Sequence, residues 1–383
     1  MTPAKPSMDL VRSVTDEHVL QAFLADARLT RAELAVRTGL SKPTASESVR
    51  RLTEAGLLRD TGERTTGRGR VGSYYALSQT LGAAVVAGIA PEGITVEVLD
   101  VRGEVAARVE HALHRPAGAR EVTRGLRDAV RRAQAGAGLA SRLAVVSAAD
   151  PVDRGTGRLV HLPDAPFLVG ELSPAQTLAD LVDGPVLVDN DVNWAARAER
   201  EAVAPQPLED FTYLYLGEGL GCAVVSDGQV RRGHVGIAGE IAHVVTRGPR
   251  GQAMRLTEVF AALGLRQPGT SAIDTGAVLR VLDGTSARAR AARTTLARAV
   301  GGVLAATVAL TDPELVVLGG PWGTHAGLVA AVREELASQP RCVPVRPAAV
   351  LEEPSLRGAR TAALQELREA VLVPPGHRDA VDA

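Results

Sequence analysis

The chain has 383 residues, 45% of them hydrophobic, and its formal net charge at pH 7 is −1. This length exceeds what one hydrophobic core usually holds, so we expect two or three domains with sizeable cores. The near-neutral charge excludes a general polyanion binder, and any contact with nucleic acid should be local. The basic excess lies at the start, because residues 1–80 carry +3 and the remainder carries −4.

The cysteines and the hydropathy pattern bear on location. Cys222 and Cys342 lie far apart without metal-ligand spacing around them, which predicts reduced thiols. The first twenty residues contain no apolar run of signal-peptide length, and no later segment supplies the roughly eighteen apolar residues of a membrane span. We therefore expect a cytoplasmic protein that is neither exported nor inserted in a membrane.

Residues 30–52, TRAELAVRTGLSKPTASESVRRL, have the pattern of a helix-turn-helix. Thr30 can cap the first helix while Glu33 reaches back to the Thr30 amide, which completes a capping box. Gly39 suits the left-handed position after the last turn, and Ser41 can cap the second helix. The segment therefore predicts two short helices joined by a tight turn.

The second helix of this pair is expected to read DNA. Ala45, Val49 and Leu52 fall on one face, which should be buried. The opposite face is small, polar and edged by arginine, which suits the major groove. The residues of this segment expected to contact DNA are Lys42, Thr44, Ser46, Glu47, Arg50 and Arg51.

A β-wing is expected next. An ordinary soluble helical hairpin would show the same caps and the same exposed charges as a DNA-binding one, so the wing favours DNA binding. Gly56 ends the helix, a strand starts at residues 57–58, and a basic loop leads to a second strand over 71–77. Glycines let the wing approach the DNA backbone, and arginines neutralise phosphates or enter a narrow minor groove. The wing residues expected to contact DNA are Arg64, Arg68 and Arg70.

Beyond residue 77, apolar strands alternate with helices, which indicates an α/β architecture. Two strand-turn-strand segments, at 84–100 and 212–228, each open one half of this region and suggest an internal duplication. We expect strands at 83–90, 94–101, 143–148, 185–188, 212–216, 222–226 and 315–318, and helices near 120–135, 192–202, 286–310, 325–338 and 357–371.

Three segments then carry a family resemblance: VDNDVNWAARAE at 188–199, LGEGLGCAVVSDGQVRRGHVGIAGEIAH at 216–243 and DPELVVLGG at 312–320. With the winged helix, the chain resembles the ROK family of repressors and sugar kinases, among its xylose-repressor-like members. The resemblance implies a winged helix-turn-helix followed by a duplicated actin-like, hexokinase-type (ribonuclease-H-like) domain whose two lobes close on a sugar.

The resemblance also implies domain bounds. A DNA-binding domain should span residues 1–78 and a ROK sugar-sensor domain residues 79–383. The small lobe would comprise about 79–190 plus 356–383, and the large lobe about 191–355. The helix at 357–371 is then expected to cross back to the first lobe.

The resemblance assigns five residues to a sugar pocket. Asn190 and Asp191 match the family's Asn-Asp pair, whose carboxylate accepts a sugar hydroxyl or, in kinases, deprotonates it. Glu240 and His243 match the sugar-contacting acid and histidine, and Glu258 matches the glutamate after the family's zinc segment. Each residue also has a purely structural alternative. The Asn-Asp pair could cap a helix, Glu240 could lie on a solvated turn, and His243 could be a packed histidine bonded to backbone. The joint match favours sugar binding.

The phosphate-binding loops depart from the kinase pattern. Residues 88–94 read GIAPEGI, in which Ala90 replaces an aspartate, Pro91 removes an amide donor and Glu92 adds negative charge. In the second loop, Glu218 adds a carboxylate that would repel the nucleotide by roughly 4 kcal/mol per charge pair. Phosphoryl transfer depends on positioning and charge, so we expect no kinase activity and no cofactor, with the kinase base only vestigial.

A zinc site is not expected either. The segment at 249–256 contains no cysteine, whereas the family's metal site uses three cysteines with the histidine that matches His243. We therefore expect no bound metal.

Three functions remain open from the sequence. The favoured one is a regulator, expected to be a repressor of carbohydrate metabolism genes, that responds to a sugar. The others are a sugar kinase with an attached DNA-binding module and an effector-independent DNA-binding regulator. The expected partners are a small-molecule sugar and double-stranded DNA with an inverted-repeat operator, read by a homodimer or a dimer of dimers.

Overall fold

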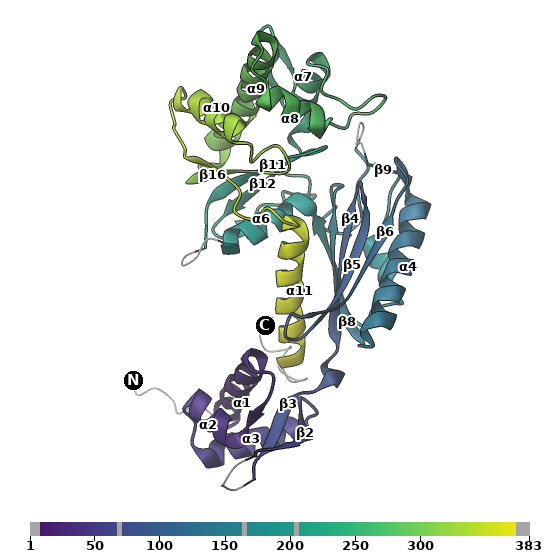
Figure 1. Ribbon diagram of the computed structural model, residues 1–383, viewed down its shortest axis with the longest axis vertical. Coiled ribbons are helices and arrows are strands. Elements are labelled where there is room, and N and C mark those ends of the chain that lie inside the picture. Colours follow the sequence, from purple (N-terminus) through teal and green to yellow (C-terminus); the bar gives the residue numbers. More distant parts are fainter. Residues whose placement is uncertain (1–7, 67–70, 163–166, 203–206, 373–383) are drawn as a thin grey trace.

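The computed structural model describes residues 8–66, 71–162, 167–202 and 207–372. Its first part is a winged helix, which lies at one end of the long axis of the molecule (Figure 1). Its strands pair antiparallel in the order β1-β3-β2. The elements are α1 (Met8–Ala25), β1 (Leu29–Thr30), α2 (Arg31–Thr38), α3 (Lys42–Glu54), β2 (Leu58–Arg64) and β3 (Ser73–Leu77).

The local signals expected for the helix-turn-helix are present. The Thr30 hydroxyl accepts the Glu33 N–H at 3.2 Å, and the Glu33 carboxylate accepts the Thr30 N–H at 2.8 Å. Gly39 is left-handed with φ 71°, and Ser41 caps α3. The winged-helix core contains Val19, Leu20, Phe23, Leu34, Ala45, Val49 and Leu52. The sequence analysis did not anticipate α1 and β1, which complete this core and its sheet.

The next part is built on a sheet of order β10-β8-β4-β5-β6. Strand β4 is buried on both faces, with Val85 and Ala87 toward α4 and Ala84 and Val86 toward α11. We call this part the first lobe. Its elements are η1 (Gln79–Leu81), β4 (Ala83–Ala90), β5 (Gly93–Asp100), β6 (Val105–Ala112), β7 (Ala117–Gly118), α4 (Ala119–Ala137), β8 (Ser141–Ala148), β9 (Leu168–Val169), α5 (Pro174–Leu178) and β10 (Val186–Asn190).

The second lobe repeats this topology. Its sheet has the order β13-β12-β11-β16-β17, with β11-β12-β13 as an antiparallel meander and β16 parallel to β11. In the first lobe β4-β5-β6 form the meander and β8 runs parallel to β4. The expected duplication is therefore visible in the connectivity.

The remaining elements follow the order of the chain. They are α6 (Asp191–Ala202), β11 (Phe211–Leu216), β12 (Leu220–Ser226), β13 (Gln229–Val230), η2 (Ile241–His243), β14 (Val245–Arg247), β15 (Ala253–Arg255), α7 (Leu256–Ala262), α8 (Thr275–Asp283), α9 (Ala287–Thr311), β16 (Leu315–Gly319), α10 (Ala326–Ala337), β17 (Val345–Pro347) and α11 (Pro354–Leu372).

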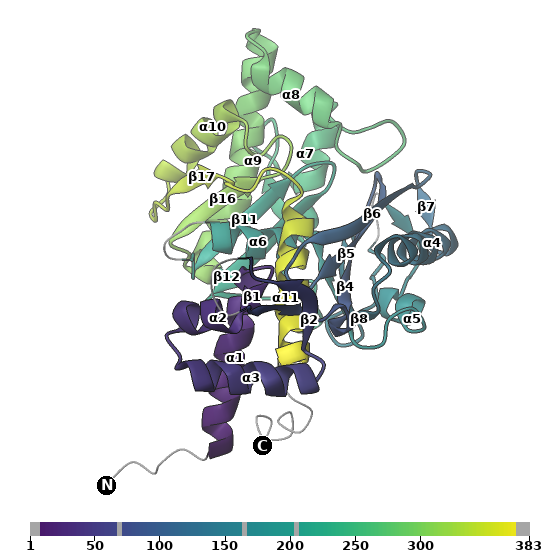
Figure 2. The same ribbon diagram turned by 60° about the horizontal axis from the view of Figure 1, so that its bottom comes forward.

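Helices α6 and α11 lie between the two sheets. The apolar face of α6 packs on the second sheet, whereas α11 packs on the first and against α6. The two helices approach closely at Gly358, where a Cβ atom would lie 1.9 Å from the Trp194 carbonyl oxygen. The C-terminal helix thus returns to the first lobe, as expected, and Figure 2 shows its C-terminal half beside the winged helix.

Helix α9 corrects the expectation about membrane spans. By length and composition alone it is long and apolar enough to cross a membrane. However, Leu296, Val300 and Leu304 of α9 are buried in the core of the second lobe, together with residues of α7, α8 and α10. Packing therefore explains the hydropathy of this helix.

Candidate functional site

A cavity of about 910 Å³ opens where the two lobes meet. It lies at the carboxyl ends of β4, β8 and β10, faced by the β11–β12 turn and by the segment around η2. The carboxyl ends of parallel strands are where α/β sheets usually bind ligands. The cavity is large enough for a small molecule.

The Asn190-Asp191 pair joins β10 to α6 at the cavity wall. The Asn190 amide donates to the carbonyl oxygens of Ala148 and Asp150, each at 3.3 Å, and its Oδ1 accepts the Val192 N–H at 2.9 Å. Asn190 therefore holds the backbone in place, as the helix-cap alternative predicted. Asp191 lines the cavity, and burial raises its pKa to about 7, with a further contribution from Asp150.

Glu240 and His243 also line the cavity. Their segment is fixed at Gly239, which has φ 93° and whose Cβ, if present, would lie 1.7 Å from the Cys222 carbonyl oxygen. Burial raises the pKa of Glu240 to about 7, and the charge of Asp150 contributes. The sequence thus placed Asp191, Glu240 and His243 at one cavity.

Glu258 is not brought to this cavity, so its placement in the sugar pocket needs correction. Its side chain is exposed on α7, and its carboxylate accepts the Arg255 N–H at 2.9 Å. It is the third residue of the helix, and its carboxylate satisfies the backbone N–H of the N-cap residue Arg255, which is one half of a capping box.

Asp150 is the cavity residue that the sequence analysis missed. It lies two residues after the end of β8, is 4% exposed and lines the cavity. Burial raises its pKa to about 6. The sequence could have indicated this residue, because Asp150 comes after an apolar strand and at the same sheet edge as Asp191.

The two loops that would hold phosphates in a kinase are joined by an ion pair. Arg115 donates to both carboxylate oxygens of Glu218, at 2.9 and 3.1 Å, and to the Pro91 carbonyl oxygen at 3.0 Å. Its guanidinium also lies 3.5 Å from Glu92. Arg115 therefore partly neutralises the Glu218 charge that was expected to repel a nucleotide. Because it binds both Pro91 and Glu218, Arg115 also connects the β4–β5 turn to the β11–β12 turn.

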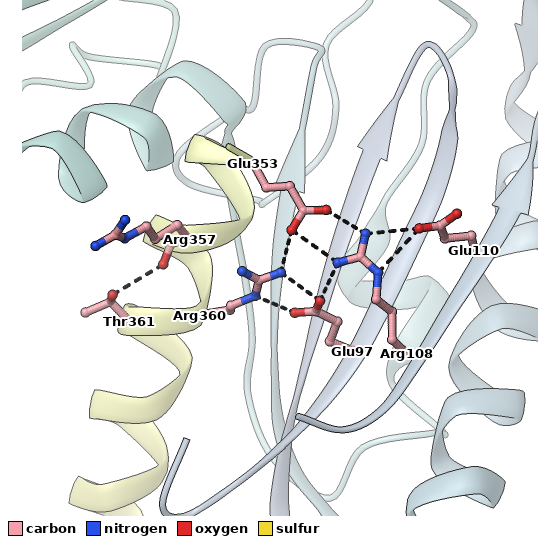
Figure 3. A network of polar contacts seen from close by, with 7 residues as sticks. All are labelled: Glu97, Arg108, Glu110, Glu353, Arg357, Arg360 and Thr361. Carbon is pink, nitrogen blue, oxygen red and sulfur yellow. Dashed lines mark hydrogen bonds and ion pairs between the residues drawn. The ribbon is translucent and has the colours of Figure 1, made fainter. Parts of the chain in front are cut away.

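A second ionic network borders the cavity at the start of α11 (Figure 3). Glu97 is 1% exposed and pairs with Arg108 and Arg360. Glu353 accepts hydrogen bonds from the same two arginines, and these bonds lower its pKa to about 2. The network ties α11 to β5 and β6.

Within residues 8–66, 71–162, 167–202 and 207–372, no three His, Cys, Asp or Glu side chains converge to hold a metal ion. The cysteine-free segment at 249–256 contains Gln252 and Met254, whose side chains contact each other at 3.9 Å.

The candidate DNA-contacting face of α3 is partly engaged within the protein. Lys42, Thr44, Glu47 and Arg50 are exposed, and Ser46 is half-buried. The Arg50 guanidinium binds the carboxylates of Glu47 at 2.6 Å and Glu54 at 2.7 Å.

Arg51 does not point freely outward, contrary to expectation. Its guanidinium binds Asp16 of α1 at 2.6 Å, and the buried Ser48 hydroxyl donates to the same carboxylate. Arg51 therefore fastens α3 to α1.

In the wing, Arg64 is exposed and pairs with Asp60 at 3.0 Å. The strands close at the tip where the Thr65 N–H donates to the Gly72 carbonyl oxygen at 2.9 Å. Arg68 and Arg70 lie outside the described residues.

Comparisons with known proteins agree with this architecture. Residues 91–366 match the model of the ROK family, and residues 12–59 match a winged helix-turn-helix DNA-binding model. The chain therefore belongs to the ROK family, and its two parts together fit a ROK-family regulator.

Two solved structures illustrate the fold. A ROK family transcriptional regulator, a homolog of the E. coli Mlc protein, has a TM-score of 0.60 at 18% identity, covering 94% of this chain and 98% of its own. The ROK hexokinase from Thermus thermophilus has a TM-score of 0.57 at 28% identity, covering 75% of this chain and 99% of its own. The first shares the fold along nearly the whole chain.

Curated relatives include kinases. The N-acetylmannosamine kinase of Citrobacter koseri is 30% identical over 192 residues, which is 48% of this chain. The bifunctional enzyme NanE/NanK of Brucella suis is 32% identical over 157 residues, which is 40% of this chain. The matched parts span 62% and 30% of these relatives, respectively.

Proposed function

We propose that this chain is a transcriptional regulator that binds DNA through α3 and the wing and binds a sugar in the cavity between its lobes. The observation that carries this proposal is the joining of a winged helix to a carboxylate-lined cavity whose β4–β5 and β11–β12 turns are bridged by Arg115 and Glu218. Carboxylates suit sugars because they accept hydrogen bonds from adjacent hydroxyls. Repression of carbohydrate genes is the role we favour.

The proposal extends to assembly and domain bounds. Residues 1–78 would act as the DNA-binding domain and 79–383 as the sensor. The small lobe would be about 79–190 plus 356–383, and the large lobe about 191–355. Helix-turn-helix proteins usually read two half-sites about one helical turn apart, so we propose a homodimer, or a dimer of dimers, on an inverted repeat.

The test begins with selection of bound DNA from a random-sequence library by the purified full chain. Operator affinity is then measured by fluorescence anisotropy with and without a panel of neutral, amine-bearing and phosphorylated hexoses. We expect an inverted-repeat sequence and a change of at least several-fold in operator affinity with one sugar. Asp191→Asn and Glu240→Ala should keep near-native affinity for DNA alone but lose most of that change. Wild-type responses in both variants would place the effector elsewhere.

A sugar kinase is the second candidate, favoured by the pKa of Asp191 near 7, which suits a general base, and by the kinase relatives. We expect no sugar-dependent release of ADP above background from the purified protein with magnesium, ATP and glucose or N-acetylmannosamine. Robust turnover would replace the sensor proposal with the kinase.

A further inference from the structure

Three carboxylates concentrate negative charge on the wall of the cavity. Asp150, Asp191 and Glu240 come from three separate segments and face the same space. The charges of Asp150 and Glu240 raise the pKa of Asp191 beyond the effect of its burial, and Asp150 acts on Glu240 in the same way. The three carboxylates are therefore close enough to repel one another.

Asp150 has no hydrogen-bond donor from the described part of the chain, although its side chain is almost fully buried. Buried carboxylates in proteins are normally paired or hydrogen-bonded, so the Asp150 carboxylate, which lines the cavity, is available to a donor that enters it. The His161 imidazole exerts an electrostatic effect on Asp150, but its Nδ1 lies 3.0 Å from the Leu168 carbonyl oxygen.

The basic residues that line the cavity do not neutralise this wall. Arg108 is engaged by Glu97, Glu110 and Glu353 in the network at the start of α11. The Nδ1 atom of His111 lies 4.0 Å from the carboxylate of Asp128, outside the cavity. The third basic residue, His243, is on the η2 segment, and its side chain is exposed.

In the part of the chain that the structure describes, no three His, Cys, Asp or Glu side chains converge closely enough to hold a metal ion. A ligand that reaches all three carboxylates must therefore extend over the cavity wall. A hexose ring has this extent, and its hydroxyls can reach two carboxylates while another substituent reaches the third.

We propose that the cavity is specific for an amino sugar, a hexose with a protonated amine, and that Asp150 receives the ammonium group while Asp191 and Glu240 bind hydroxyls. This rests on the proposed function, since it names the class of sugar. An ammonium group supplies N–H donors and the positive charge that the wall lacks. A neutral sugar leaves the repulsion in place, and a phosphorylated sugar adds to it.

The experiment is calorimetric titration of the purified full chain near pH 7, where Asp150 is ionised and a sugar amine is still largely protonated, with matched pairs of sugars. The pairs are glucosamine with N-acetylglucosamine, mannosamine with N-acetylmannosamine, and 6-amino-6-deoxyglucose with glucose, and glucose 6-phosphate serves as the anionic probe. In at least one pair, we expect the amine to bind about tenfold or more tightly than its neutral partner, with the phosphate weakest.

Asp150→Asn should abolish the preference for the amine, so that the two members of the pair bind within about twofold of each other. Asp183→Asn, an exposed aspartate outside the cavity, is the matched control and should retain the full preference. Thermal unfolding of each variant confirms folding, and Glu240→Gln, which should weaken both members of the pair, provides a second substitution in the same wall.

The outcomes separate this inference from the function on which it rests. If neutral sugars bind as tightly as amines, the amino-sugar inference fails while the sensor proposal stands. If the preference survives in Asp150→Asn, the assignment of the ammonium site fails. If no sugar in the panel binds, the sensor proposal and this inference both fail.

Discussion

Asp150 carries a charge into the protein interior, and the stability of the fold should therefore depend on pH. The unfolded chain has an aspartate pKa of about 4, whereas burial raises the pKa of Asp150 to about 6 in the fold. The His161 imidazole lowers the pKa of Asp150 and so opposes this shift, and the charge of Asp150 in turn raises the pKa of Asp191 and Glu240. Below about pH 4 the carboxyl is protonated in both states, and above pH 6 the fold bears the full cost of its charge.

Asp150→Asn should consequently stabilise the free protein by on the order of 2 kcal/mol near pH 8 and by little near pH 4. The measurement is chemical unfolding at both pH values, with Asp183→Asn as the exposed control. An Asp150→Asn variant that is destabilised near pH 8 would show that the carboxylate is paired in the fold.

Arg50, which we propose contacts DNA, is restrained by ion pairs within the protein. Its guanidinium bridges Glu47 and Glu54, and these exposed pairs contribute little to stability. A guanine or phosphate can therefore replace them at low cost. Because the same carboxylates lie beside the DNA-facing surface, they also oppose non-specific contacts with phosphate.

We expect Arg50→Ala to weaken operator binding by about 1–3 kcal/mol and leave sugar binding unchanged. Arg70→Ala should weaken it through the wing. Arg288→Ala, an exposed arginine on α9, is the control. Gel-shift affinities that stay at the wild-type value in both variants would remove α3 and the wing as the DNA-binding surface.

At the scale of elements, the sequence predicted those whose formation depends on local pattern. Strand β4 is a continuous apolar run and was found with its observed bounds, 83–90, and α2 was specified by its capping box. Strand β6, with exposed and half-buried residues alternating along Val105–Ala112, lacks such a run and was missed. Strand β1 has two residues and forms only by pairing with β3.

The candidate site was predictable to a similar degree. Asp191 and Glu240 were found because motif matches identify them, and their elements converge on the cavity. Asp150 was missed because its importance arises from burial beside carboxylates distant in sequence. Glu258 was misplaced because a motif match does not distinguish a ligand contact from a capping residue.

The β4–β5 and β11–β12 turns are joined by the Arg115–Glu218 pair, which bridges the lobes. The pair is partly exposed, with 45% and 21% of the two side chains accessible, so it should be worth about 1 kcal/mol or less. We expect Arg115→Ala to lower the ratio of closed to open molecules by up to about fivefold. Small-angle scattering should show a larger radius of gyration, which saturating ligand reverses. An unchanged radius would mean that other contacts hold the lobes together.

At the scale of the whole molecule, α11 connects the cavity to the winged helix. Glu353, directly before its first residue, lines the cavity and is bonded to Arg108 and Arg360 (Figure 3). Toward its other end, Leu367 belongs to the same buried cluster as Leu24 of α1. A change of lobe arrangement that moved α11 would therefore reach α1, the helix that supports α3.

The contact of Leu24 with the α11 cluster should carry part of this coupling. A ligand can change DNA binding only by the difference in its affinity for two arrangements, and moving a population from 1:99 to 99:1 requires about 5.5 kcal/mol. Leu24→Ala removes a buried side chain at the junction, where large-to-small changes cost about 2–5 kcal/mol. We expect this variant to keep near-native affinity for the sugar but to lose most of the sugar-induced change in operator affinity.

The control is Leu282→Ala, which removes a leucine side chain that is buried in the core of the second lobe, and which should lower stability but retain the response. Titration of both variants with the sugar and with the selected operator measures the two affinities separately. A full response in Leu24→Ala would show that the signal reaches the winged helix by another route, because the α11 junction would then be dispensable.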